Sequence, residues 1–273
     1  MMNSSLVEGK DLDSLLQPFS TIYAFLMVAG FYGNGAIIWA TVRNKSLHTP
    51  CNVLIAISCL LDSFHLLGHG LFFFFTYFSS TQLISSHSCL ILMTIPYIGV
   101  TGSTLCVLSI GLDRLFSCCI PTRYVHKSAS LYLFVHISFI VSFSFFIIQS
   151  AFEESDERLV FCFIPQGFQG SSKTLWTRSS VVVYSVAFLI YCAVWAKLQL
   201  NQQIRQIRRI FRSLFIVMLS EVGGWMATMG GYTLYLTIHP ESPPLELLKW
   251  EFIVGLPLNI TMAFPWVIYY CAR

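Results

Sequence analysis

Three stretches of the sequence, residues 130–151, 179–196 and 252–272, contain no Asp, Glu, Lys or Arg. A helix that crosses the hydrocarbon core of a membrane needs about 20 mostly apolar residues, and each stretch has about that length. The whole chain follows the same trend, because 11% of its residues are charged, whereas soluble domains average about 25%. These features predict an integral membrane protein.

Seven segments are long and apolar enough to span a membrane. They are residues 18–42, 52–78, 89–119, 130–151, 179–197, 213–238 and 248–271. The short alternating segments that are typical of a membrane β-barrel are not found in the sequence. We therefore expect an all-α integral membrane fold, a seven-transmembrane-helix bundle that forms a single domain over residues 1–273.

Lys and Arg residues are divided unequally between the two sides of such a bundle. With the N-terminus outside, eleven of the sixteen fall at cytoplasmic ends and five fall outside. Loops rich in Lys and Arg stay in the cytoplasm, so the distribution predicts an outer N-terminus. The net charge of +3 follows from this topology. The charge therefore does not indicate a nucleic-acid partner. The expected partner of the apolar helices is the lipid bilayer.

The nine cysteines form two groups under this topology. Cys89 and Cys162 lie on the predicted outer side, where disulfides form, and the others lie within helices or near the cytoplasm, where thiols stay reduced. We therefore expect a disulfide between Cys89 and Cys162, which would join the third helix to the second outer loop. Two free thiols are the alternative.

A charge pair ends the third apolar segment, in the stretch GLDRLFSCCIPTRY at residues 111–124. Arg114 lies 25 residues after Cys89, Pro121 follows seven residues later, and Tyr124 three residues after that. With GNGAIIWATVRNKSLHTPCNVLIAI and the final VIYYCAR, this spacing resembles the rhodopsin-like G-protein-coupled receptors, and more narrowly the nematode serpentine chemoreceptors of the Srsx class. For an isolated Arg114, the simpler interpretation is a membrane anchor whose long side chain reaches water.

The resemblance implies a cell-membrane chemosensory receptor that signals through a heterotrimeric G protein, and not an enzyme. In such receptors an acidic residue restrains the arginine until the sixth helix moves outward and the arginine meets the Gα subunit. Asp113 and Arg114 would have these two roles here. Tyr191 and Tyr269 would swing toward Arg114 in the active form.

The resemblance also places Asn34 and Asp62 in a polar network at mid-membrane, which binds Na⁺ in some relatives. A structural hydrogen-bonding role is the alternative. Glu221 lies in the sixth segment and has no counterpart in the family pattern. An ionised carboxylate is costly at that depth, so Glu221 is expected to be protonated or paired.

The ligand, a small molecule or a peptide, is expected to bind from the outside between the helices, without a cofactor or metal. The predicted lining residues are Met93, Pro96, Tyr97, Thr101, Trp225 and Met229. Packing between helices is the alternative role for each of them. Pro96 stands where amine receptors have Asp, and the seventh segment lacks the Lys within the helix that opsins need. Both of those ligand classes are therefore disfavoured.

Several residues depart from the family pattern. Ala227 stands where the sixth helix usually has proline, Pro265 stands at the usual position of an Asn, and the sequence ends at Arg273. A truncated or non-signalling receptor is therefore an alternative. A seven-helix membrane hydrolase is another, because His65 and His69 share a helix face on which zinc could bind. A transporter would favour inverted repeats, which the sequence does not display.

Overall fold

The computed structural model describes residues 9–79, 83–120, 128–200, 205–239 and 241–271. Within these ranges the chain is almost entirely helical. The long helices are α1 (Gly9–Arg43), α2 (Pro50–Tyr77), α4 (Thr94–Cys119), α6 (Ala129–Glu153), α8 (Gly170–Leu200), α9 (Arg205–Ile238) and α10 (Pro244–Ala263). The short elements are η1 (Lys45–Leu47), β1 (Leu83–Ser85), α3 (Ser86–Leu92), β2 (Leu159–Phe161), α7 (Ile164–Gly167) and α11 (Pro265–Cys271).

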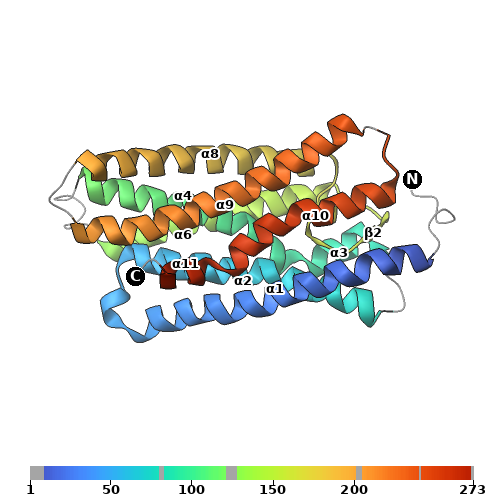
Figure 1. Ribbon diagram of the computed structural model, residues 1–273, viewed down its shortest axis with the longest axis horizontal. Coiled ribbons are helices and arrows are strands. Elements are labelled where there is room, and N and C mark those ends of the chain that lie inside the picture. Colours follow the sequence, from blue (N-terminus) through green and yellow to red (C-terminus); the bar gives the residue numbers. More distant parts are fainter. Residues whose placement is uncertain (1–8, 80–82, 121–127, 201–204, 240, 272–273) are drawn as a thin grey trace.

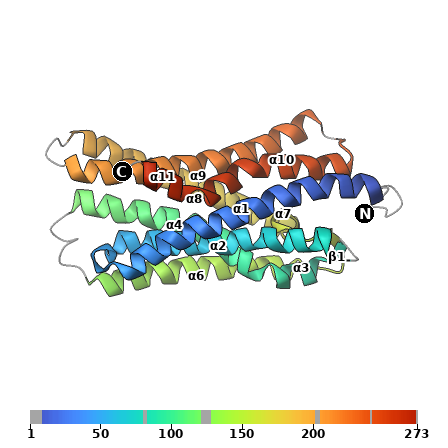
Figure 2. The ribbon, with the colours of Figure 1, turned by 60° about the horizontal axis from the view of Figure 1, so that its bottom comes forward.

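The long helices run side by side along the longest axis of the molecule (Figures 1 and 2). α4 is central and packs against α2, α6 and α8, whereas α1 packs against α2 and α10. Burial agrees with this arrangement, because 78% of the apolar part of α4 is buried, compared with 28% for α1, α6 and α8. The outward faces of those three helices carry exposed apolar side chains such as Phe25, Phe145 and Leu189. Such faces suit contact with lipid.

Five helices in the described ranges, α1, α2, α4, α6 and α8, are long and apolar enough to cross a membrane. α9 and α10 are also long, with 34 and 20 residues, but both contain several charged residues. α9 starts with a run of basic residues, and α10 contains Glu246, Lys249 and Glu251. These two helices nevertheless pack into the bundle, α9 against α8 and α10 and α10 against α1.

Pro96 divides the third helix of the bundle. The sequence predicted one helix over 89–119, whereas the structure has α3 and α4 with a break at Met93. Proline has no N–H, so Pro96 leaves the carbonyl of Leu92, four residues earlier, without its helical hydrogen bond. The chain therefore departs from α-helical geometry at this point.

A second proline divides the last helix, which the sequence predicted as one segment over 248–271. In the structure, α10 ends at Ala263 and α11 begins at Pro265. Phe264, between them, has φ −121° and ψ 27°. A residue that precedes proline disfavours the helical region because its backbone would clash with the proline ring.

α8 begins at Gly170, well before the predicted start at 179. Glu154 stabilises this early start, because it accepts hydrogen bonds from the Ser171 hydroxyl and, at 3.3 Å, from the Ser172 N–H. A carboxylate at a helix N-terminus satisfies free N–H groups and is favoured by the helix dipole. The hydrogen bond from Ser171 lowers the pKa of Glu154. Glu154 therefore stays ionised at lower pH than a free glutamate.

One end of the bundle carries the two short strands and a disulfide, and is called the disulfide end. β1 and β2 pair antiparallel, with Ile84 opposite Val160. The predicted disulfide is confirmed, since Cys89 and Cys162 are bonded with their Cα atoms 5.3 Å apart. The starts of α1, α8 and α10 lie at this end, and η1 and the end of α4 lie at the opposite end (Figure 1).

Removal of this disulfide is expected to lower the unfolding midpoint of the purified protein by about 5–10 °C. The bond closes a loop with a sequence separation of 73 residues, for which loop-closure entropy gives at most about 4 kcal/mol. The test compares three proteins: the parent chain, the double variant Cys89→Ser, Cys162→Ser, and the control Cys192→Ser, which removes a free thiol. Equal midpoints for all three proteins would contradict a stabilising disulfide.

Candidate functional site

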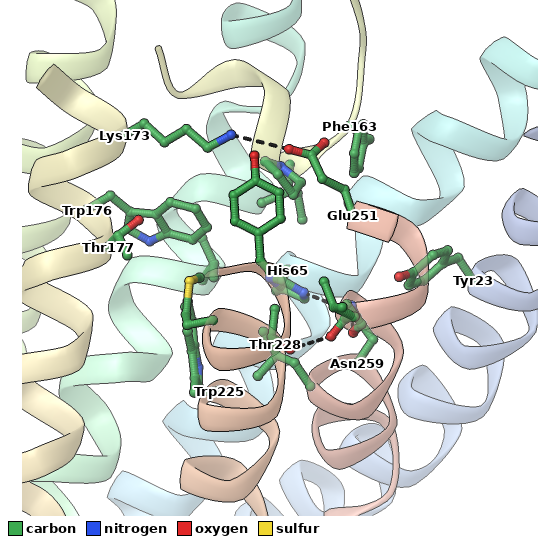
Figure 3. Close-up of a pocket in the computed structure, with 18 of the residues that line it drawn as sticks. Tyr23, His65, Phe163, Lys173, Trp176, Thr177, Trp225, Thr228, Glu251 and Asn259 are labelled. Carbon is green, nitrogen blue, oxygen red and sulfur yellow. Dashed lines mark hydrogen bonds and ion pairs between the residues drawn. The ribbon is translucent and has the colours of Figure 1, made fainter. Parts of the chain in front are cut away.

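A cavity of about 480 Å³ opens between the helices near the disulfide end. Residues of α1, α2, α4, α8, α9 and α10 line it, together with residues of the chain between β2 and α8 (Figure 3). Its walls are mostly apolar, and their aromatic members are Tyr23, Phe72, Phe163, Trp176, Trp225 and Tyr232. A concave, largely apolar site of this size with a few polar groups is typical of a small-molecule pocket.

An ion pair lies at the mouth of the cavity. Lys173 Nζ of α8 is 3.4 Å from Glu251 Oε1 of α10, and Gln166 Nε2 donates to Glu251 Oε2 at 2.6 Å. The ammonium group also lies 5.6 Å from the centre of the Tyr232 ring. Glu251 is buried, and these contacts compensate its charge. These residues were not predicted from the sequence, although two charges near the starts of apolar helices were a signal for them.

Two histidines and an asparagine form the floor of the cavity. His65 Nε2 and His69 Nε2, both on α2, lie 2.9 and 2.6 Å from Oδ1 of Asn259 on α10. The Tyr23 ring packs against His69, with centroids 4.6 Å apart. Asn259 lies eight residues beyond Glu251 on α10, so the floor is about 12 Å below the mouth along the helix axis. Asn259 was not predicted, because an asparagine in an apolar segment gives no signal of its distant partner.

Two of the six predicted lining residues, Trp225 and Met229, line this cavity. The other four, Met93, Pro96, Tyr97 and Thr101, are buried in the structure and lie outside the lining of this cavity.

The loop after β2 explains this difference. α7 lies against this part of the third helix, and the Tyr97 hydroxyl donates to the carbonyl of Ile164 at 3.3 Å. The ring of Tyr97 also packs on Phe168, with centroids 4.7 Å apart. The cavity is therefore displaced toward α2, α9 and α10.

The two residues of the predicted polar network have different hydrogen-bond partners in the structure. Asn34 Nδ2 donates to the carbonyl of Met262 at 3.4 Å, whereas Asp62 Oδ1 accepts from the Ser103 hydroxyl at 2.5 Å. Asp62 also faces a smaller cavity of about 20 Å³, whose lining includes Glu221. Oε2 of Glu221 is buried without a hydrogen-bond partner among the described residues.

The histidine pair bears on the hydrolase alternative. Within the described ranges, no three His, Cys, Asp or Glu side chains group closely enough to hold a metal ion. His65 and His69 instead share the carbonyl oxygen of Asn259. Their common helix face, which the sequence suggested for zinc, serves a contact between α2 and α10.

A second ion pair lies at the end of the bundle opposite the disulfide. Arg114 donates to Oδ2 of Asp113 through Nη2 and, at 3.0 Å, through Nε. The Asp113 side chain is fully buried, and the Arg114 side chain is 18% exposed. Tyr191 is buried nearby, and its hydroxyl donates to the carbonyl of Val107 at 3.4 Å.

Three other residues of the predicted coupling region are not described. Pro121 and Tyr124 lie outside the described residues, as does the side chain of Tyr269, whose backbone belongs to α11. Their predicted roles stay predictions.

A comparison with protein families decides the identity of the chain. The family model of the serpentine-type seven-transmembrane G-protein-coupled chemoreceptors of the Srsx class matches residues 27–272. The chain belongs to this family. No curated protein matches it. The chain is thus a membrane protein, and α9 and α10 complete the seven helices that begin with α1.

Position 221, which holds Glu221, should accept glutamine but not lysine. Gln keeps the shape and hydrogen-bonding capacity of the side chain, whereas Lys brings a charge that costs about 3 kcal/mol at the centre of a spanning helix. We expect near-normal surface expression for Glu221→Gln and a loss of at least about tenfold for Glu221→Lys. Thr237→Lys is the control, because Thr237 is exposed near the end of the same helix. Equal expression of the two Glu221 variants would show that Glu221 faces water.

Proposed function

We propose that this chain is a multi-pass chemosensory receptor of the cell membrane that binds its ligand from outside and activates a heterotrimeric G protein. Its N-terminus and disulfide end would face outward, which agrees with the excess of Lys and Arg at the opposite end and with a disulfide in an oxidising compartment. The ligand would occupy the cavity near the disulfide end.

The ion pair between Asp113 and Arg114 carries this proposal. It lies at the inner end of the central helix α4, where a buried carboxylate holds a partly exposed guanidinium. A charge pair at the edge of water can exist in two arrangements, one closed on itself and one open to a partner. Asp113 is the proposed restraint, and Arg114 is the proposed contact for the Gα subunit.

The central helix connects the cavity to this ion pair. Val100 of α4 lines the cavity, and Asp113 lies 13 residues further on the same helix, about 20 Å away. Trp225 brings α9 to the same cavity and packs against Tyr184 of α8, with ring centroids 5.3 Å apart. A bound ligand would therefore contact both α4 and the helix that moves outward in this family.

A non-signalling receptor is the second candidate function. α9 runs as one helix from Arg205 to Ile238 through Ala227, where related receptors have proline. Proline is a common cause of helix kinks, and a straight α9 would have no such hinge. The basal signalling assay distinguishes the two candidates without a known ligand.

Asp113→Asn is expected to raise basal signalling about fivefold at matched surface level. Asparagine removes the charge that holds Arg114, and a lost restraint of about 1 kcal/mol changes the active population by about that factor. Signalling is measured in cells with a promiscuous G-protein reporter. The surface level comes from an epitope tag at the N-terminus probed on intact cells, which also tests the orientation. An unchanged basal signal would favour the non-signalling receptor, and a tag hidden on intact cells would overturn the orientation.

A further inference from the structure

The floor of the cavity has fixed hydrogen-bond directions. Asn259 Nδ2 donates to the carbonyl of Gly255 at 2.8 Å. A carbonyl oxygen only accepts hydrogen bonds, so this contact orients the Asn259 amide and turns Oδ1 toward the histidines. Oδ1 also only accepts, so His65 and His69 must both donate to it through Nε2.

The Nδ1 atoms of both rings are therefore acceptors when the rings are neutral. The neutral form is favoured, because no carboxylate contacts either ring among the described residues and an unpaired charge is costly in this buried place. The two acceptors differ in access. Nδ1 of His65 is fully enclosed without a partner. Nδ1 of His69 is not enclosed, has no partner in the described ranges, and belongs to a side chain that lines the cavity.

The enclosed part of the cavity offers no unbalanced charge. Three ionisable side chains other than histidine and tyrosine line it, and Lys173 and Glu251 neutralise each other at the mouth. The third, Arg178, also lines the cavity but is exposed, so its charge is not enclosed by the apolar walls. A charged ligand would have to separate the mouth pair or lose its hydration without compensation.

We propose that this cavity binds an uncharged, mainly apolar molecule whose hydrogen-bond donor, a hydroxyl or an N–H group, reaches Nδ1 of His69. The aromatic walls bind the apolar body, and the distance of about 12 Å between mouth and floor limits its length. Molecules with an acceptor alone, such as ethers, leave His69 unsatisfied and bind more weakly. This ligand class rests on the proposed function in one respect, namely that the cavity is the ligand site.

The test measures binding of five probes that share one skeleton to the purified full chain in lipid nanodiscs, by ligand-observed NMR titration. The probes are 3-phenylpropan-1-ol, its methyl ether, propylbenzene, 3-phenylpropylammonium and 3-phenylpropanoate, and empty nanodiscs provide the partitioning background. The alcohol is expected to bind about tenfold more tightly than the ether and the two ions, because it forms one additional hydrogen bond without a charge to desolvate. An ether or an ion that binds as tightly as the alcohol overturns the proposal, as does the absence of binding by all five.

His65 provides a matched control for His69. His69→Phe and His65→Phe each remove one donor to Asn259 from the same face of α2, but His69→Phe alone removes the acceptor that the cavity reaches. His69→Phe should bind alcohol and ether within about twofold of each other, whereas His65→Phe should keep the tenfold preference. Loss of the preference in both variants overturns the assignment to His69. If His69→Phe does not fold, the ranking of the probes on the parent protein decides.

Binding in nanodiscs needs no G protein, so the outcome of this experiment does not depend on the signalling proposal. Retained ranking with no basal response in Asp113→Asn would leave the ligand class standing without a signalling function. A lost ranking with normal signalling would place the ligand chemistry elsewhere.

Discussion

Gly99→Ala should prevent most of the receptor from folding and reaching the cell surface. A Cβ atom at Gly99 of α4 would lie 2.3 Å from the backbone N of His65 and 2.5 Å from the carbonyl oxygen of Leu61, both on α2. Backbone atoms cannot rotate away, so α2 and α4 would have to separate. Overpacking of this kind costs about 3 kcal/mol, which lowers the ratio of folded to unfolded protein by about a hundredfold.

Two other glycines are the controls for this prediction. At Gly102, one turn further on α4, the nearest atom to an added Cβ is Leu61 Cδ2 at 2.9 Å, the end of a flexible side chain. At Gly230 of α9, an added Cβ would meet nothing within 4 Å. Gly102→Ala should lose a small part of its expression, and Gly230→Ala none, because alanine favours helix more than glycine. Similar size-exclusion profiles and surface levels for all three variants would contradict the close packing of α2 on α4.

Local chemistry made part of this fold predictable from the sequence. The pairing of Cys89 with Cys162 followed from the compartments in which cysteines are oxidised. Asp113 and Arg114 are neighbours in the chain, so their ion pair needed no knowledge of the fold. The long apolar segments identified the helices because the bilayer fixes their minimum length.

Long-range geometry was not predictable. The cavity shifted away from Tyr97 because the loop after β2 covers the third helix, and no periodicity encodes the path of a loop. Asn259 meets His65 and His69 from a helix almost 200 positions away. Such a contact depends on the rotation and register of two whole helices, which hydrophobic patterns determine only to within a face.

Helix ends were predicted less well than helix positions. Pro96 and Pro265 each divide a segment that the sequence suggested was continuous. Hydropathy does not detect a helix break at proline, because proline removes a hydrogen bond without making the segment less apolar. The early start of α8 depends on Glu154, which comes from a different loop.

Arg114→Lys should abolish most signalling while the receptor still reaches the membrane. Arg114 contacts Asp113 through two nitrogens of its planar guanidinium group. Lysine is also a long cation and would serve equally well as an anchor at the edge of the membrane. It offers a single ammonium group and cannot reproduce the planar, multi-donor contact that a Gα subunit would receive from arginine. The substitution therefore separates anchoring from coupling.

The experiment can be made without a ligand. Arg114→Lys is introduced into the Asp113→Asn variant, whose basal signal is expected to be raised, and we expect the double variant to lose at least about tenfold of that signal at matched surface level. Arg43→Lys in the same background is the matched control, because Arg43 lies at the same end of the bundle. There its guanidinium carbon lies 4.4 Å from the centre of the Trp39 ring. That control should keep the raised signal. If the Arg114→Lys double variant signals as strongly as the Arg43→Lys one, Arg114 is an anchor, and the ion pair no longer supports a coupling role.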